Sequence, residues 1–261
     1  ALRVLDRHSL VARKAAGSNV ARQVIAANLD ALFIVSSCNA DFNAGRMERF
    51  LVLAASAGVE PVVVLTKADT AENPEPFVTQ AQALKSGLAV VLMDAKRGDV
   101  RGQLAPWCGP GQTVALLGSS GVGKTTIANA LTGGAAAVQE VRDDDAKGRH
   151  TTTGRYLVAM TDGGWLIDTP GMREVQLSDA YDGIGLFFDD LTALSLTCKF
   201  RNCRHAGEPG CAVQGAIAAG DLDPARLVRW QKLLAEDGTN TATMETSALR
   251  AAGRRFYPKK K

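Results

Sequence analysis

The sequence predicts an α/β fold in which helices cover a mostly parallel sheet of about six strands, followed by a smaller, largely helical unit. Two observations carry this prediction. Short apolar runs rich in β-branched residues alternate with helical patterns between residues 31 and 167, which favours parallel strands joined by helices. One of these runs also leads through a glycine-rich turn of defined spacing directly into a helix.

Six apolar runs are expected to be strands: 31–35, 61–65, 89–93, 113–117, 155–160 and 165–167. Helices are expected at 43–57, at about 76–86 and at 126–131, the first of them ending at Gly58. Because parallel strands end at one common edge, ligands are expected beside the carboxyl ends of these strands.

Composition excludes several classes of protein. The chain has 261 residues, of which 46% are hydrophobic and 22% charged, as in ordinary globular proteins. The formal net charge is only +3, so no general basic field indicates nucleic acid, and no apolar run approaches the roughly 20 residues of a membrane helix. Basic residues crowd the tail from Arg250 to Lys261. This tail either contacts RNA phosphates or is a solvated tail, and both interpretations stay open.

Residues 1–18 carry a short apolar alternation among basic residues. They form either the last strand of a preceding β domain or a frayed leader. The chain begins at Ala1 without Met and directly inside this pattern, so we expect that an N-terminal portion is absent.

A complete G-x-x-x-x-G-K-T motif follows the run 113–117 and opens the helix 126–131. Glycines allow unusual backbone angles, so that the N–H groups of the turn and of the helix N-terminus point at an anion. Lys124 can reach the β- and γ-phosphates, and the Thr125 hydroxyl can bind Mg²⁺. The nucleotide-binding residues expected here are Gly118, Ser119, Ser120, Gly121, Val122, Gly123, Lys124, Thr125 and Thr126.

The sequence Asp168-Thr169-Pro170-Gly171 closes the last predicted strand. An Asp at a strand end downstream of a P-loop is where a P-loop NTPase holds its Mg²⁺, usually through water. Gly171 allows a backbone N–H to meet the γ-phosphate. Turns generate D-x-x-G freely, so the position after a buried strand is what supports this interpretation.

The sequence Thr66-Lys67-Ala68-Asp69 resembles the N-K-x-D motif of base recognition. A carboxylate at Asp69 can accept from both the N1–H and the 2-amino group of guanine, whereas adenine offers neither. The Lys67 stem can lie over the base. Thr66 replaces the usual Asn, which leaves a shorter hydroxyl where an amide would approach the base and tie loops together.

The order of the motifs is unusual, because base recognition precedes the phosphate motifs. A circular permutation of a GTPase sheet would produce this order, with the strands in the same places but differently connected. Between the P-loop helix and Asp168 lies the polar stretch 148–153. A threonine here, for which Thr152 is our candidate, can bind Mg²⁺ while its backbone senses the γ-phosphate. A plain polar loop is the alternative.

Three of the five cysteines fall between residues 198 and 211, which indicates metal binding in a reducing compartment rather than a disulfide framework. These three thiolates and the imidazole of His205 would fill all four positions of a tetrahedral Zn²⁺. We therefore expect a structural site that stabilises a small domain. Chance clustering of free thiols is the alternative, and Cys38 and Cys108 are interpreted as small apolar residues. The expected zinc ligands are Cys198, Cys203, His205 and Cys211.

Together these motifs resemble the circularly permuted, ribosome small-subunit-dependent GTPase A family (RsgA, also called YjeQ or YloQ). The resemblance runs from about Val11 to the C-terminal helix and is most specific at 148–153, 168–174 and 198–211. It implies a permuted P-loop GTPase domain at 19–178, a zinc-binding domain with the basic tail at 179–261, and a remnant of an otherwise missing OB-fold domain at 1–18. It also implies a cytoplasmic factor that acts late in small-subunit assembly and hydrolyses GTP on the subunit.

Two positions bear on the mechanism that the resemblance implies. The Ser-Ala of the guanine loop of many GTPases stands here as Asp94-Ala95. Met172 follows D-x-x-G where Ras-like enzymes place a water-orienting Gln, and a thioether cannot orient water, so we expect slow hydrolysis by the chain alone. We hypothesise that His150 supplies the missing polar group once the ribosome orders its loop, and that it acts with Lys124 and Thr152.

Three functional classes are therefore compared. The first is a monomeric regulatory GTPase that uses Mg²⁺ and acts with the small ribosomal subunit and its rRNA. The second is an RNA-binding assembly scaffold whose nucleotide site only tunes affinity. The third, an ATP-driven enzyme such as a small-molecule kinase, is disfavoured by Asp69, which rejects adenine.

Overall fold

The computed structural model describes residues 6–14, 22–134, 156–168 and 180–256. The chain divides into two compact units, one formed by 1–13 with 23–175 and the other by 14–22 with 176–261. Each unit is described by itself. Within the described residues, no helix combines the length and the apolar character needed to cross a membrane.

The first unit contains a six-stranded sheet with the strand order β5-β4-β3-β6-β8-β7. All neighbouring strands are parallel except β7 and β8, which are antiparallel. The mostly parallel sheet predicted from the sequence is therefore confirmed, and each of the six apolar runs contributes one strand. The strands are β3 Ala31–Ser37, β4 Glu60–Thr66, β5 Ala89–Leu92, β6 Thr113–Leu117, β7 Tyr156–Ala159 and β8 Trp165–Asp168.

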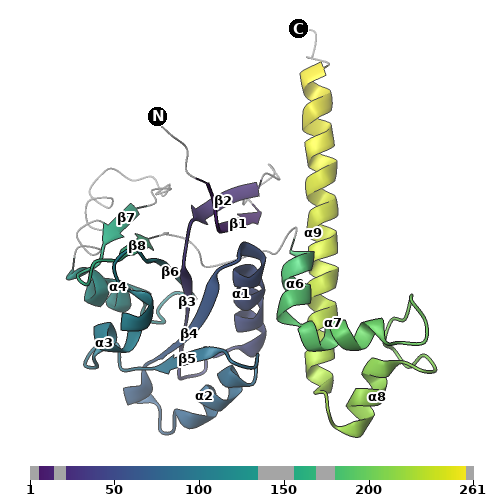
Figure 1. Cartoon of the computed structure of the whole chain (residues 1–261), viewed down its shortest axis with the longest axis horizontal. Coiled ribbons are helices and arrows are strands. Elements are labelled where there is room, and N and C mark those ends of the chain that lie inside the picture. The colour runs from purple at the N-terminus through teal and green to yellow at the C-terminus, as the bar shows by residue number, and fades with distance from the viewer. Residues whose placement is uncertain (1–5, 15–21, 135–155, 169–179, 257–261) are drawn as a thin grey trace. The chain divides into compact units, whose positions relative to one another are not determined.

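Helices connect the parallel strands, and Figure 1 shows α1 and α4 on opposite sides of the sheet. The Asn43 side chain accepts from Arg46 N at the start of α1, and Gly58 ends this helix with a φ of 66°, as expected for a helix C-terminus. The helix α2 ends before the predicted residue 86, and α3 was not predicted. The helices are α1 Ala44–Ala57, α2 Glu75–Gln82, α3 Val100–Leu104 and α4 Lys124–Thr132, with short 3-10 turns η1 Ala68–Thr70 and η2 Ala105–Trp107.

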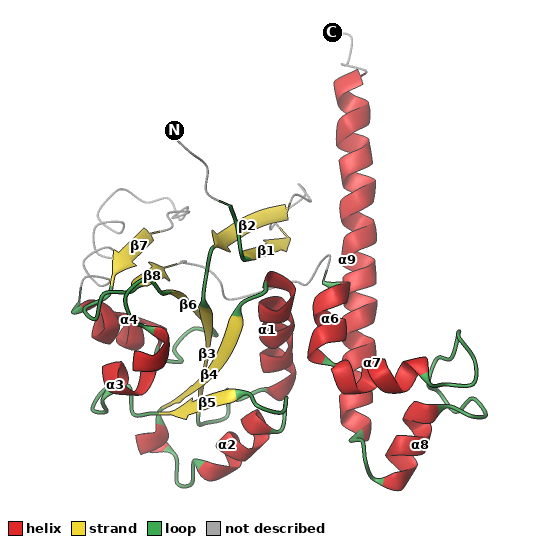
Figure 2. Ribbon diagram, in the orientation of Figure 1, coloured by secondary structure: helices red, strands yellow, loops and turns green. Residues whose placement is uncertain are grey.

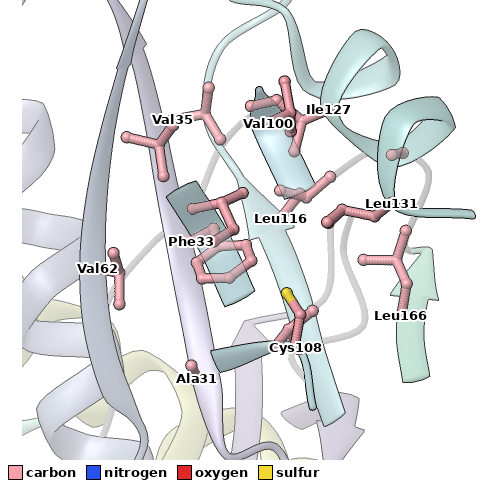
Figure 3. Packing of buried hydrophobic residues seen from close by; sticks show 14 of the residues in the cluster. Ala31, Phe33, Val35, Val62, Val100, Cys108, Leu116, Ile127, Leu131 and Leu166 are labelled. Atoms are coloured by element: carbon pink, nitrogen blue, oxygen red, sulfur yellow. The ribbon is translucent and has the colours of Figure 1, made fainter. Parts of the chain in front are cut away.

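Alternating side chains give the sheet two apolar faces. Phe33 is in register with Val62 of β4 and Leu116 of β6, so these three side chains share one face. On this face they pack with Val100 of α3 and Ile127 of α4 (Figure 3). Complete burial of a side chain such as Phe33 contributes about 1.5–3 kcal/mol. This core holds the strands whose ends carry the candidate site.

A two-stranded sheet of β1 Leu10–Lys14 and β2 Arg22–Ala27 precedes the large sheet. Ser9 Oγ donates to the Leu29 carbonyl at 2.8 Å, and Asn28 N donates to the Ser9 carbonyl at 3.0 Å. The strand β1 lies within residues 1–18, for which the sequence indicates either a strand or a frayed leader. The strand β2 was not predicted.

The described residues of the second unit from 180 onward contain helices and loops but no strand (Figure 2). Phe188 ends α6 and precedes α7, so residues 181–196 form two helices and not one. The last helix begins at Pro224. The helices are α6 Tyr181–Phe187, α7 Asp189–Leu196, α8 Ala212–Ala219 and α9 Pro224–Phe256.

Candidate nucleotide site and metal centre

The P-loop lies between the end of β6 and the start of α4. A Cβ on Gly118 would lie 2.2 Å from the Val35 carbonyl oxygen of the neighbouring β3, so only glycine allows this close approach. Gly121 and Gly123 have φ values of 78° and 99°, which favour glycine as well. The motif glycines are thus required by the shape of the turn.

Lys124 is the first residue of α4, and its side chain folds back over the loop. Its Nζ donates to the Gly118 carbonyl at 2.7 Å and also to the Ser119 carbonyl. Thr125 is exposed and Thr126 half-buried in the same first turn. The unpaired N–H groups of a helix N-terminus and this ammonium together give the turn positive charge, as an anion site requires.

Thr66 joins the base motif to the P-loop. Its hydroxyl donates to the Val122 carbonyl at 2.6 Å, although the two residues are 56 positions apart in the sequence. The Thr66 carbonyl accepts from Cys38 N at 2.9 Å. The ends of β3, β4 and β6 are therefore held together at one edge of the sheet by contacts of Thr66.

Lys67 and Asp69 lie in the turn that follows β4. Lys67 has a φ of 58°, and its carbonyl accepts from both Thr70 N and Thr70 Oγ1, at 3.1 and 3.0 Å. Asp69 is exposed in η1. Because Thr70 closes the turn behind it, the Asp69 carboxylate is carried by an ordered segment and is available to a ligand.

The loop after β5 contains Asp94 and Ala95. The Asp94 carboxylate accepts from Lys96 N at 2.9 Å and from Arg97 N at 3.2 Å. A carboxylate that binds the main chain of its own turn is a common turn-stabilising device. Asp94 thus has a structural task here that a serine hydroxyl could also perform.

The magnesium and switch residues are described only in part. β8 is parallel to β6, with Ile167 in register with Ala115, so Asp168 at the end of β8 reaches the same edge of the sheet as the P-loop. Gly171, His150 and Thr152 lie outside the described residues, as does the side chain of Asp168.

Three cysteines and one histidine of the second unit converge. The Cys198 and Cys211 sulfurs are 3.9 Å apart, and His205 Nδ1 lies 3.6 and 3.4 Å from them. With Zn–S of about 2.3 Å and Zn–N of about 2.0–2.1 Å, a tetrahedral zinc would separate its ligand atoms by about 3.5–3.8 Å. The residues present therefore fit a tetrahedral metal ion. The complete cluster, with its four ligand atoms within 4.8 Å of one another, is Cys198, Cys203, His205 and Cys211.

Neighbouring groups hold these ligands in place. Gln214 donates from its backbone N to Cys211 Sγ at 3.4 Å and from its side chain to the His205 carbonyl at 2.6 Å. The Glu208 carboxylate accepts from Arg204 N and Ala206 N at 2.7 and 2.8 Å. These N–H groups, that of Arg204 foremost, lower the pKa of Glu208 to about 2, so the loop between Cys203 and Cys211 is closed by an ionised carboxylate.

The direction of the pKa shift distinguishes Cys198 from the two cysteines outside the cluster, whereas within the cluster burial foremost raises the pKa of Cys203 to about 11. Desolvation opposes ionisation of Cys198, but backbone N–H groups of Ala212 and Val213 at the start of α8 favour the thiolate, and its pKa is lowered. Burial raises the pKa of Cys38, and it raises that of Cys108 to about 12. Cys38 and Cys108 are thus inert core thiols, in agreement with their interpretation from the sequence.

Comparison with known proteins assigns this architecture to a family. The family model described as RsgA GTPase matches residues 4–178. The chain belongs to the RsgA GTPase family. It is similar to "Small ribosomal subunit biogenesis GTPase RsgA" of Mesorhizobium japonicum, 54% identical over 243 residues that cover 92% of this chain and 70% of the relative. It is also similar to "Small ribosomal subunit biogenesis GTPase RsgA 2" of Vibrio parahaemolyticus, 49% identical over 256 residues that cover 98% of this chain and 71% of the relative.

Solved structures support the same fold. The crystal structure of YjeQ from Thermotoga maritima matches with a TM-score of 0.65 and 24% identity, over 90% of this chain and 77% of that one. The crystal structure of YloQ, a circularly permuted GTPase, matches with a TM-score of 0.61 and 25% identity, over 82% of this chain and 70% of that one. The permuted fold expected from the order of the motifs is thereby confirmed.

Within this RsgA fold, the structure places the base motif and the P-loop at one edge of the sheet, and it places the four expected zinc ligands in one cluster. Sequence reasoning did not single out Gln214. Its position in the sequence could have indicated this role. Gln214 lies three residues after Cys211, the N-cap of α8, and Glu or Gln at this helix position commonly hydrogen-bonds back toward the N-cap.

Proposed function

We propose that this chain binds GTP with Mg²⁺, hydrolyses it slowly on its own, and acts in maturation of the small ribosomal subunit, which stimulates the hydrolysis. Family membership and the names of its relatives support the GTPase and the ribosomal role. One observation of this structure supports the nucleotide site above all. The Thr66 hydroxyl binds the Val122 carbonyl, which brings a guanine motif beside a phosphate loop.

Each residue has a separate task in this proposal. The Asp69 carboxylate accepts from guanine N1–H and the 2-amino group, with the Lys67 stem over the base. Backbone N–H groups of 118–124 bind the phosphates, and Lys124 reaches the β- and γ-phosphates. Mg²⁺ is held by Thr125, Thr152 and Asp168, and it would neutralise charge on the phosphates. Gly171 meets the γ-phosphate, and His150 orients water when the subunit orders its loop.

The metal centre is proposed to hold one structural Zn²⁺ per chain. Its four protein ligands leave no position for a substrate, so the ion would stabilise the fold of the second unit rather than catalyse a reaction. The ligand distances near 3.4–3.9 Å support this assignment.

A second candidate function is an RNA-binding scaffold, with the nucleotide site tuning affinity only. It is favoured by an exposed aromatic beside the metal centre, because Phe200 is 44% exposed and the Lys199 ammonium lies 5.4 Å from its ring centre. Bases stack on exposed aromatic rings, and lysines bind phosphates.

We place the protein in the cytoplasm as a monomer that contacts the small subunit and its rRNA.

The test is GTP turnover by this chain with and without purified small ribosomal subunits, with ATP as the control substrate. Strong, GTP-specific stimulation is expected. Turnover that subunits leave unchanged, combined with subunit binding that survives loss of hydrolysis, would favour the scaffold. A preference for ATP would contradict the assignment of Asp69 and revive an ATP-driven enzyme.

A further inference from the structure

The Thr66 hydroxyl has no hydrogen left for a ligand. Thr66 is the last residue of β4, and its exposed fraction is 0%. Its Oγ1 lies 2.6 Å from the Val122 carbonyl oxygen and 3.2 Å from the Ser36 carbonyl oxygen. Carbonyl oxygens only accept, and a hydroxyl has a single proton to donate. That proton is therefore committed to the main chain, and chiefly to Val122.

The same hydrogen bond orients a peptide of the phosphate loop. The Val122–Gly123 peptide is trans, so its C=O and N–H point in opposite directions. Because the Val122 carbonyl faces the buried Thr66, the Gly123 N–H points away from Thr66. A glycine leaves its own peptide free to rotate, and the Thr66 hydroxyl removes part of that freedom.

We propose that Thr66 positions the phosphate loop and does not read the base, so that the site accepts guanine nucleotides that carry C–H instead of nitrogen at position 7. This inference rests on the proposed GTP site. Guanine N7 is an acceptor, so its recognition requires a hydrogen-bond donor. An Asn amide at residue 66 has two hydrogens and could give one to N7, whereas the single hydrogen of the Thr66 hydroxyl is already bound to the main chain. Recognition of the base then depends on the other edge of guanine, where Asp69 accepts from N1–H and the 2-amino group.

The probes are GDP and 7-deaza-GDP, whose dissociation constants are measured by titration calorimetry with the full chain and with two variants. Thr66→Val removes the hydroxyl at nearly constant shape, and Thr66→Ser keeps it. Thermal unfolding of each variant shows that it is folded at the temperature of the titration. Asp69→Asn serves as the positive control for a residue that reads the base.

The wild-type chain is expected to bind the two nucleotides within about twofold of each other. Thr66→Val is expected to weaken both by the same factor of about ten, which corresponds to about 1.4 kcal/mol, and Thr66→Ser to restore tight binding. Equal loss for both nucleotides in a Thr66→Val chain that thermal unfolding shows to be folded, reversed by the serine hydroxyl, is the result expected if the hydroxyl positions the loop.

Two results would overturn the inference while leaving the GTP site intact. One is a wild-type preference for GDP over 7-deaza-GDP above about fivefold, which would show that N7 is read. The other is unchanged binding by folded Thr66→Val, which would show that the hydroxyl does not position the loop. If the wild-type chain binds neither nucleotide, the proposed function and the inference fail together.

Discussion

Arg226 of α9 forms a bidentate ion pair with Asp190 of α7. Its Nε and Nη2 donate to the two carboxylate oxygens at 2.8 and 2.9 Å. The same guanidinium lies 4.7 Å from the ring centre of Phe188, at the break between α6 and α7. One side chain thus ties the long last helix to the two helices that precede the metal centre.

Replacing this arginine by lysine is expected to destabilise the second unit. Arg226→Lys loses the bidentate geometry and the stacking on Phe188, which we estimate at about 1–2 kcal/mol in the free energy of unfolding. Urea unfolding followed by circular dichroism measures the change. Arg229→Lys is the matched control, because its ion pair with the exposed Asp223 has a separation of 3.7 Å and little energetic weight. Equal losses in the two variants would contradict the assigned role.

The same ion pair predicts how stability depends on pH. Burial opposes ionisation of Asp190, but the hydrogen bonds and charge of Arg226 outweigh it and lower the pKa. Since the folded pKa lies below the unfolded one, the stabilisation is fully present above the unfolded pKa and is lost as the pH falls through the folded value. Asp190→Asn should therefore lose stability relative to wild type near neutral pH, with a gap that narrows below about pH 4. A gap that stays constant from pH 7 to pH 3 would count against this account.

A methyl group on the first glycine of the P-loop should strongly weaken nucleotide binding. In Gly118→Ala the new Cβ would meet the Val35 carbonyl oxygen at 2.2 Å, so the loop or β3 has to move. We expect GDP affinity, measured by calorimetry, to fall by about 100-fold, the size of the rate loss that a misplacement of about 1 Å can cause in an enzyme. Gly111→Ala also has a positive φ, of 82°, but meets nothing within 4 Å. It should lower the melting temperature without changing GDP affinity.

Metal content tests the Cys₃His cluster directly. Purified chain should contain about one zinc ion per molecule by elemental analysis. Cys198→Ser and His205→Ala should lower that content and the helical signal of the second unit, because zinc binding is coupled to folding. Cys38→Ala is the control, since Cys38 lies in the first unit as an inert core thiol. Full zinc content in both ligand variants would refute the site.

A change of one carboxylate should change the preferred base. Asp69→Asn loses the acceptor for guanine N1–H and the 2-amino group, and we expect GTP binding to weaken about 5- to 150-fold, the value of a bidentate contact of about 1–3 kcal/mol. Xanthine carries an oxygen where guanine has the 2-amino group, so binding of XTP should improve in this variant. Fluorescent nucleotide competition measures both. Unchanged GTP affinity would remove Asp69 from base recognition.

Much of this architecture could be predicted because its signals are local. The six strands are short apolar runs, and the run before Gly118 together with the complete motif was sufficient to predict a P-loop. The four residues of the Cys₃His cluster could be predicted because thiols and imidazole are chemically selective metal ligands. Helix α3, with five residues, has no amphipathic period long enough to detect. The pairing of Arg226 with Asp190 was also missed, because nothing in a single sequence connects positions 36 residues apart.

Thr66 shows the limit most clearly. Its place in a T-K-x-D motif suggested a group near the base, whereas the structure shows its hydroxyl engaged by the Val122 and Ser36 carbonyls. Which acceptor a hydroxyl finds depends on tertiary packing between strands. The domain boundaries, and all of the switch and magnesium residues, Thr125 included, remain predictions.

The strand order has a consequence for synthesis of the chain. β3 pairs with β4 on one side and with β6 on the other, but β6 is made 76 residues after β3 ends. Until β6 leaves the ribosome, the nascent chain carries β3 as an uncovered sheet edge whose seven residues are all buried in the finished protein. An open apolar edge of this kind invites pairing with other chains. Fragments that stop between Leu92 and Thr113 should therefore aggregate, and chaperone dependence should end when β6 closes that edge.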